Sequence, residues 1–317
     1  SNPDEMSDGL DNDGNGYVDD IRGWDFGNND NNPTDNCSNG ATLDFGYHGT
    51  HVAGIIGAVG NNGTDVVGVN WKTTILPLKI ADNLCDLSVS GEVQAFYYAI
   101  DHGVDIINMS FGGSESFSED TVINAATTAG IVLIAASGND NSNSMATSFP
   151  AAHANVFAVS ATNRNDVKAG FSNFGTWIDV SAPGVAIEST FPTAWAEGST
   201  TYLDGTSMAS PMVAGVAGLI LSQYPTLTAT EVYNRLKYSA ENIDSRNPGY
   251  QGYMGTGRVN AARALTSVTS ISPTFSITNA TVSATIQGIS FVPNSEVWLK
   301  KTGQSPIKAT QVQITTT

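Results

Sequence analysis

Three side chains in this sequence have the chemistry of an acyl-transfer site, and Ser207 is the first. It stands in the segment Gly-Thr-Ser-Met-Ala-Ser-Pro, residues 205–211, before small and apolar residues at helical spacing. A serine in the first turn of a helix lies near unpaired N–H groups and the positive end of the dipole, which favour a developing oxyanion. Taken alone, the pattern also fits a serine that only caps a core helix.

A histidine and an asparagine complete the set. His48 opens a second small-residue segment, His-Gly-Thr-His-Val-Ala-Gly, residues 48–54, and Asn139 follows an apolar run that is typical of a buried β-strand. A nucleophile, a general base and a side-chain amide donor are the parts that acyl transfer requires. Together they favour a catalytic role for Ser207 over a capping role.

These three segments, in this order, resemble the motifs of the subtilisin-like serine proteases, and the resemblance covers residues 17–265. It implies a serine endopeptidase of broad specificity, in which Ser207 attacks the peptide carbonyl, His48 transfers the proton and Asn139 holds the oxyanion. It also implies that an extended polypeptide substrate lies along residues 110–113. The substrate-binding residues implied in this way are Ser110, Phe111, Gly112, Gly113, Ala136 and Gly138.

The acid of the catalytic triad is the point at which the sequence departs from the family. The family carries this aspartate in an apolar strand ending Asp-[Ser/Thr]-Gly, and residues 1–47 contain no such strand. Asp44 precedes His48 by four residues but does not match the motif. We therefore expect the chain to be truncated before its first strand, and to be a poor protease in this form.

Residues 11–20, Asp-Asn-Asp-Gly-Asn-Gly-Tyr-Val-Asp-Asp, have the spacing of the first half of a calcium-binding loop. Arg22 stands where the last ligand of an EF-hand would fall, so an aspartate must close the shell. An acidic linker without metal is the alternative. The candidate ligands of this structural calcium are Asp11, Asp13, Asn15, the carbonyl of Tyr17, Asp19 and Asp20. The family resemblance also implies a weak second cation at Asp179, with a surface aspartate as the equal alternative.

The composition limits the partners of the chain. Its 317 residues include 30 acidic and 13 basic side chains, for a net charge of −17, so the phosphates of a nucleic acid would be repelled. The sequence lacks an apolar run long enough to predict a transmembrane helix. Cys37 and Cys85 could form one disulfide or remain two thiols. We expect a secreted or cell-surface protein.

Helical and strand patterns alternate along most of the chain, which predicts an α/β fold: a three-layer parallel sheet with helices on both faces. Active sites of such folds lie at the carboxyl ends of the strands. The expected helices are residues 50–59, 90–102, 119–129 and 229–240, together with a buried helix that has Ser207 in its first turn and contains the apolar run 216–221. The expected strands are residues 75–80, 105–109, 156–162 and 177–180, together with a buried strand that begins at Val132 and ends in a turn at Asn139.

We expect two domains, a peptidase domain of residues 1–268 and a β-segment of residues 269–317. The second part is rich in Ser and Thr, alternates apolar residues, and resembles the opening of an IPT/TIG-type immunoglobulin-like sandwich. Such a domain would offer a route to cell-surface attachment, and a linker is the alternative. A rival function is a non-catalytic, calcium-stabilised surface or adhesion protein with a degenerate protease fold. An α/β-hydrolase is disfavoured because Ser207 lacks the Gly-x-Ser-x-Gly elbow.

Overall fold

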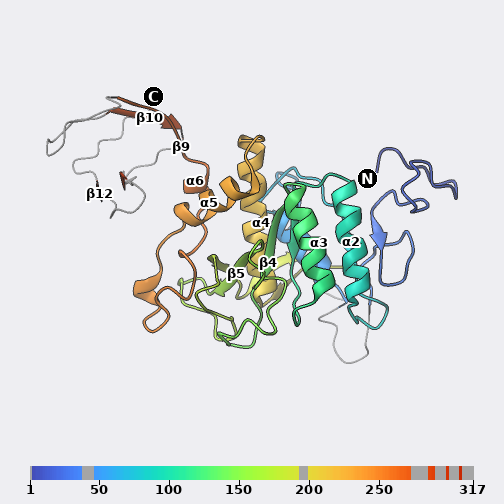
Figure 1. Cartoon of the computed structure of the whole chain (residues 1–317), viewed down its shortest axis with the longest axis horizontal. Helices are drawn as coiled ribbons and strands as arrows, with labels where there is room; N and C mark the ends of the chain where they lie inside the picture. Colours follow the sequence, from blue (N-terminus) through green and yellow to red (C-terminus); the bar gives the residue numbers. More distant parts are fainter. Residues whose placement is uncertain are drawn as a thin grey trace. The chain divides into compact units, whose positions relative to one another are not determined.

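The computed structural model describes residues 2–37, 46–192, 199–272, 285–289, 298–299 and 307–308 (Figure 1). Contacts divide the chain into two compact units, Ser1–Val259 and Asn260–Thr317. The first unit therefore ends before residue 268, where the sequence pattern placed the domain boundary. Within the described ranges, none of the helices combines the length and apolar character needed to cross a bilayer.

A four-stranded parallel sheet with the order β3-β4-β5-β6 forms the centre of the first unit. Its strands are β3 (Ile106–Met109), β4 (Val132–Ala136), β5 (Phe157–Thr162) and β6 (Val180–Pro183). Both β4 and β5 are buried along their whole length, as expected where helices cover both faces of a parallel sheet. A separate parallel pair joins β1 (Trp24–Asp25) to β2 (Leu78–Lys79).

The helices lie on both faces of this sheet. On one face, α2 (Val89–Asp101) and α3 (Phe117–Thr128) lie side by side (Figure 1) and pack on Met109 of β3. On the other face, α4 (Thr206–Gln223) contacts Asn108, because neighbouring strand residues point to opposite faces. The expected α/β fold with a parallel sheet between helices is confirmed.

Two further helices of the first unit pack beside α4. They are α1 (His48–Gly57) and α5 (Ala229–Ser239), and a short 3-10 turn, η1 (Asp244–Arg246), follows α5. Val52 and Ile55 of α1 share an apolar cluster with Met208 of α4. Val52 lies one helical turn after His48, and Met208 directly follows Ser207. Since these neighbours share one apolar cluster, the two expected catalytic residues lie at the starts of helices that pack together.

Some boundaries differ from those expected for the strands. The region 75–80 forms only the two-residue strand β2, and β6 begins at Val180 rather than at Trp177. At Asp179 a side-chain oxygen takes the place of a main-chain carbonyl in the strand pairing, because Asp179 Oδ2 accepts the N–H of Ala158 at 2.8 Å. Regular pairing between β5 and β6 therefore starts one residue later, at Val159 and Val180.

The antiparallel hairpin β7 (Ile187–Thr190) and β8 (Thr200–Leu203) was missing from the expected elements. It supports α1, because the hydroxyls of Ser189 and Thr190 donate to the carbonyls of His51 and Thr50 at 2.7 and 2.9 Å. The backbone of α1 comes so close to the hairpin that a Cβ at Gly54 would collide with the side chains of Ser189 and Thr190. The hairpin thus fixes the helix that begins at His48.

The second unit has the helix α6 (Ala261–Ala264) and four strands among its described residues. β9 (Ser267–Ser272) pairs antiparallel with β10 (Thr285–Ile289), and β11 (Trp298–Leu299) pairs antiparallel with β12 (Ile307–Lys308). Strands are what the alternation in this region predicts. Its resemblance to an immunoglobulin-like sandwich stays a prediction.

A disulfide joins Cys37 to Cys85, whose Cα atoms are 5.1 Å apart. The sequence had left this pairing open. The bond ties the segment that precedes α1 to the loop that precedes α2. Disulfides persist in oxidising compartments and are rare in the reducing cytosol.

Candidate active site

Ser207 is the second residue of α4, as the sequence predicts. Its Oγ donates to the main-chain carbonyl of Ser110 at 3.1 Å, and Ser110 Oγ donates back to the carbonyl of Ser207 at 2.9 Å. Ser110 directly follows β3. These reciprocal bonds place the start of α4 against the carboxyl end of β3, at the edge of the sheet where active sites of this fold lie.

Asn139 lies in the loop after β4, close to the same helix end. Its Oδ1 accepts two hydrogen bonds from Thr206, one from the main-chain N–H and one from Oγ1, each 2.9 Å long. Its Nδ2 and the N–H of Ser207 both lie beside Gly205, at 3.7 and 3.5 Å from the position of a Cβ there. Two donors close to one point, with the amide oxygen already engaged, are suited to binding an oxyanion.

His48 is the first residue of α1 and is half-buried. Burial, with a smaller contribution from His51, lowers its pKa to about 4. The imidazole is therefore neutral at neutral pH and can accept a proton. Within the described residues, its side chain makes no hydrogen bond, and catalytic hydrogen bonds are often formed only with substrate present.

Asp44, the acid nearest to His48 in the sequence, lies outside the described residues. Asp35, which the sequence analysis did not single out, lies at the N-terminus of α1 instead. Its Oδ2 accepts the N–H of Thr50 at 2.8 Å and lies 3.2 Å from a Cβ built on Gly49. Burial raises the pKa of Asp35, and the hydrogen bonds from the helix oppose that change. Asp35 thus caps α1 from outside the helix, where local capping patterns would not reveal it.

The expected substrate segment follows β3 and borders Ser207. The main-chain N–H of Gly113 donates to the carbonyl of Phe149 at 2.7 Å, and the carbonyl of Gly113 accepts the N–H of Phe149 at 3.1 Å. Both main-chain groups of Gly113 are therefore already engaged. Phe111 packs against the cluster of α2 and α3, and Gly112 is exposed. Ser110, Phe111 and Gly112 therefore remain as the part of the segment that could meet a substrate backbone.

Two further residues of the expected substrate site lie near Asn139. Ala136 ends β4 and is 5% exposed. The N–H of Gly138 donates to Thr206 Oγ1 at 3.1 Å. Their contact with substrate stays a prediction, whereas the role of Gly138 in holding the loop against α4 is visible in the structure.

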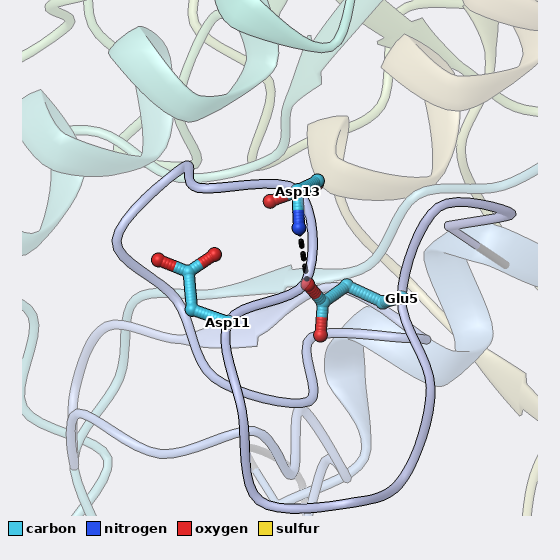
Figure 2. A group of neighbouring side chains, drawn as sticks. All are labelled: Glu5, Asp11 and Asp13. Carbon is cyan, nitrogen blue, oxygen red and sulfur yellow. Dashed lines mark hydrogen bonds between the residues drawn. The ribbon is translucent and has the colours of Figure 1, made fainter.

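The acidic loop brings together three carboxylates, of Glu5, Asp11 and Asp13, with oxygens within 4.8 Å of one another (Figure 2). Glu5 was missed by the sequence analysis because it lies outside the 11–20 pattern. Its Oε1 accepts the N–H groups of Asn12 and Asp13 at 2.6 and 3.0 Å. Clustered carboxylate oxygens are the ligands that calcium prefers, so this donor set fits the ion.

Two of the other expected ligands, Asp19 and Asp20, lie outside the group of three carboxylates and make hydrogen bonds of their own. The carboxylate of Asp19 accepts the N–H groups of Asp8 and Gly9. Asp20 is fully buried and accepts the hydroxyl of Tyr98 in α2 at 2.6 Å. Asp20 thus docks the loop on α2, and an aromatic cluster around Tyr17 completes that contact.

Asn15 connects the two acidic groups of the loop. Its Nδ2 donates to Asp13 Oδ2 at 3.1 Å and to Asp20 Oδ2 at 2.9 Å. Its Oδ1 accepts the N–H of Tyr17 at 2.8 Å. The side chain therefore acts as a brace between the carboxylate cluster and the docking residue.

Asp179, the expected second cation site, is paired with a lysine. Lys237 of α5 places Nζ 2.8 Å from Asp179 Oδ1, while Oδ2 accepts the N–H of Ala158. The ammonium group supplies the positive charge that a bound cation would bring. A separation of 58 residues hid this partner from the sequence analysis.

Comparisons with known proteins agree with this geometry. The family model described as Peptidase_S8, Subtilase family, matches residues 6–284. Thermitase of Thermoactinomyces vulgaris is 38% identical over 248 residues, covering 77% of this chain and 81% of thermitase. Subtilisin DY of Bacillus licheniformis is 41% identical over 222 residues, covering 68% of this chain and 77% of that protein. The cell wall-associated protease of Bacillus subtilis is 36% identical over 72% of this chain, which spans only 27% of that larger protein.

Solved structures show the same relationship. A protease of Pseudoalteromonas arctica superposes with a TM-score of 0.62 and 34% identity, over 69% of this chain and 70% of that chain. A cold-adapted subtilisin-like serine proteinase gives a TM-score of 0.62 and 29% identity, over 75% of this chain and 78% of that chain. With a family model over most of its length and relatives of this identity and coverage, the chain belongs to the subtilase family.

Proposed function

We propose that this chain is a serine endopeptidase with Ser207 as nucleophile, His48 as general base and Asn139 as oxyanion donor. Membership of the subtilase family supports peptide-bond hydrolysis. The observation that carries the residue assignment is the pair of donors at the start of α4, Asn139 Nδ2 and the N–H of Ser207, which lie beside the same point at Gly205.

The reaction begins with the proton of Ser207 Oγ. That proton is donated to Ser110 O in the free chain, so the hydroxyl rotates toward His48 when a substrate carbonyl arrives. The neutral imidazole takes the proton as Oγ attacks, and then gives it to the leaving amine. Asn139 Nδ2 and the Ser207 N–H hold the oxyanion, and water releases the acyl group by the same steps in reverse. The aspartate partner of His48 stays a prediction of the sequence pattern.

The substrate of this reaction is an extended polypeptide that pairs with the main chain of residues 110–112. Main-chain pairing supplies affinity without reading side chains. Exposed Gly112 presents no side chain to the substrate. Broad specificity is the expected consequence.

Calcium has a structural part in this proposal. Glu5, Asp11 and Asp13 would hold it, and Asp20 would transmit the ordering of the loop to α2 through Tyr98. A bound ion would neutralise the crowded carboxylates and stabilise the folded loop by mass action. The disulfide between Cys37 and Cys85 supports function outside the cytosol.

A fluorophosphonate probe tests the assignment, because it reacts only with an activated serine. We expect slow labelling of the full chain that maps to Ser207 by mass spectrometry. Labelling is lost in Ser207→Ala and His48→Ala, and is retained in Ser222→Ala, a matched exposed serine near the other end of α4. A folded chain that neither labels nor cleaves an unfolded polypeptide contradicts the proposal, as does labelling that survives Ser207→Ala.

A further inference from the structure

Asn173 is a fully buried asparagine in the connection between β5 and β6, and the mechanism above gives it no role. Its exposed fraction is 0%. Within the described residues, its side chain bonds only to the segment 137–148, which follows β4 and contains Asn139. A buried amide is costly unless its donors and acceptors are paired. Here one loop provides all of these partners.

The bonds of Asn173 bracket Asn139 along the chain. Asn173 Oδ1 accepts the N–H of Asp140 at 2.9 Å and the N–H of Ser142 at 3.0 Å. Asn173 Nδ2 donates to the carbonyl of Ser137 at 3.0 Å. One side chain therefore holds the main chain on both sides of Asn139.

Additional contacts leave this loop little freedom. The main-chain N–H of Asn173 donates to the carbonyl of Gly138 at 2.9 Å, and Asn173 Nδ2 also lies 3.2 Å from Ser148 Oγ. Gly138 has φ = +101°, and a Cβ there would lie 2.5 Å from Asn173 Nδ2. Only glycine allows the loop to come this close to the buried amide.

We propose that Asn173 is a positioning residue for the oxyanion site. It fixes the main chain around Asn139 from one side, while Thr206 holds Asn139 Oδ1 from the other. Between these two supports, Nδ2 is aimed at the start of α4 beside Ser207. The inference rests on the proposed function and deepens it, because an oxyanion donor is effective only when it is oriented before the charge develops.

Replacing Asn173 by alanine leaves the N–H groups of Asp140 and Ser142 without their acceptor, so the loop relaxes. Asn139 then loses its fixed direction, and the transition state is affected more than substrate binding. We expect kcat, or the phosphonylation rate, to fall about 10- to 100-fold, as misplacement by about 1 Å can do. KM should change little.

A double-mutant cycle separates positioning from general stability. The rate constant for phosphonylation of Ser207 is measured in the full chain, in Asn173→Ala, in Asn139→Ala and in the double variant. Asn173→Ala should slow the reaction when Asn139 is present and change it less than about 3-fold when Asn139 is absent. An equal loss in both backgrounds, or no loss in either, overturns the proposal. Asn173→Ser provides a milder variant if alanine prevents folding.

Asn247→Ala is the matched control. Asn247 is also buried, at 3% exposure, and bonds through its side chain to Lys168, Asp166 and Ile243. None of these partners belongs to the segment 137–148 or to α4. We expect this variant to lower the melting temperature while the phosphonylation rate stays within about 3-fold. A rate loss as large as that of Asn173→Ala would show that destabilisation alone explains the effect.

Amide hydrogen exchange gives a readout that does not need activity. The N–H of Thr206 is protected by Asn139 Oδ1, so its exchange reports where Asn139 lies. In Asn173→Ala we expect faster exchange at Asp140, Ser142 and Thr206. Unchanged protection at Thr206 would overturn the positioning role even if the chain proves inactive. Absence of labelling in the unaltered chain would instead count against the proposed function.

Discussion

Asn139 and Thr206 are joined by two hydrogen bonds of 2.9 Å, which both end on Asn139 Oδ1. Thr206 Oγ1 also accepts the N–H of Gly138 at 3.1 Å. The residue before the proposed nucleophile thus fixes the orientation of the Asn139 amide, the proposed oxyanion donor. This arrangement leaves Nδ2 as the end of the amide that lies beside Gly205 at the start of α4.

Thr206→Val should slow the reaction while keeping the shape of the side chain. The methyl group that replaces the hydroxyl cannot hydrogen-bond to Asn139 Oδ1 or to the N–H of Gly138. Each of these two groups then loses a hydrogen bond worth about 1 kcal/mol. We expect the phosphonylation rate of Ser207 to fall about 10-fold. Thr206→Ser keeps the hydroxyl and should react nearly as fast as the unaltered chain, so equal rates for the two variants would contradict the anchoring role.

The pH dependence of labelling should reflect the lowered pKa of His48. Because that pKa is about 4, the rate should rise through about pH 4 and be flat from about pH 6 to 8. The folded chain favours the neutral form of the His48 imidazole. As the pH drops, His48 is protonated at a higher pH in the unfolded chain than in the folded chain. The free energy of unfolding should therefore fall as the pH drops from 6.5 to about 4. A rate that rises near pH 7 would indicate an anionic partner beside the imidazole.

Removal of calcium should lower the melting temperature. An ion present at about 100 times its dissociation constant stabilises the folded state by about 2.7 kcal/mol, and a chelator removes that contribution. Glu5→Gln and Asp13→Asn should reproduce most of the loss in calorimetry. Asp8→Asn, an exposed aspartate of the same loop outside the carboxylate cluster, should keep the chelator response. Identical melting curves with and without chelator would disprove the calcium proposal.

Glu92 and Glu119 should make the chain less stable at alkaline pH. Both are buried, at 8% and 5% exposure, on the neighbouring helices α2 and α3. Burial, followed by the charge of Glu119, raises the pKa of Glu92 far above its usual range. The stability that protonated Glu92 contributes is fully present below about pH 4.5 and is lost as the pH rises from there through about 8.

Glu92→Gln tests this pair, because the amide keeps the shape and cannot ionise. We expect its melting temperature at pH 9 to exceed that of the unaltered chain by roughly 2–4 °C, with little difference at pH 5. Glu115→Gln, at an exposed position, controls for the loss of one negative charge. An equal gain in both variants would assign the effect to net charge.

Reduction of the disulfide should destabilise the first unit. Cys37 and Cys85 are separated by 48 residues, and cross-links of this kind contribute about 2–4 kcal/mol. We expect a lower melting temperature with reductant and in the double variant Cys37→Ser, Cys85→Ser. Reductant should have no further effect on the double variant, and an effect there would point to another cause.

The sequence determined the element ends at which the proposed catalytic residues lie, because the relevant signals are local. A helix start at Ser207 and at His48, and a strand end before Asn139, follow from residue spacing over a single element. The alternation of helices and strands likewise predicted a parallel sheet, whose carboxyl ends collect such residues. Short, irregular pieces such as β2 were harder to place, because their pairing depends on a partner strand far along the chain.

Only the tertiary structure decided which polar groups support these residues. The bonds that link Asn139 to Thr206 and Asn173 to Asp140 cross 67 and 33 residues, and the capping of α1 by Asp35 crosses 15. No periodicity connects such partners. Each amide or carboxylate could form its hydrogen bonds with water or with many other groups. The packing of α4 and of the β5–β6 connection against the segment 137–148 determines which of these hydrogen bonds form.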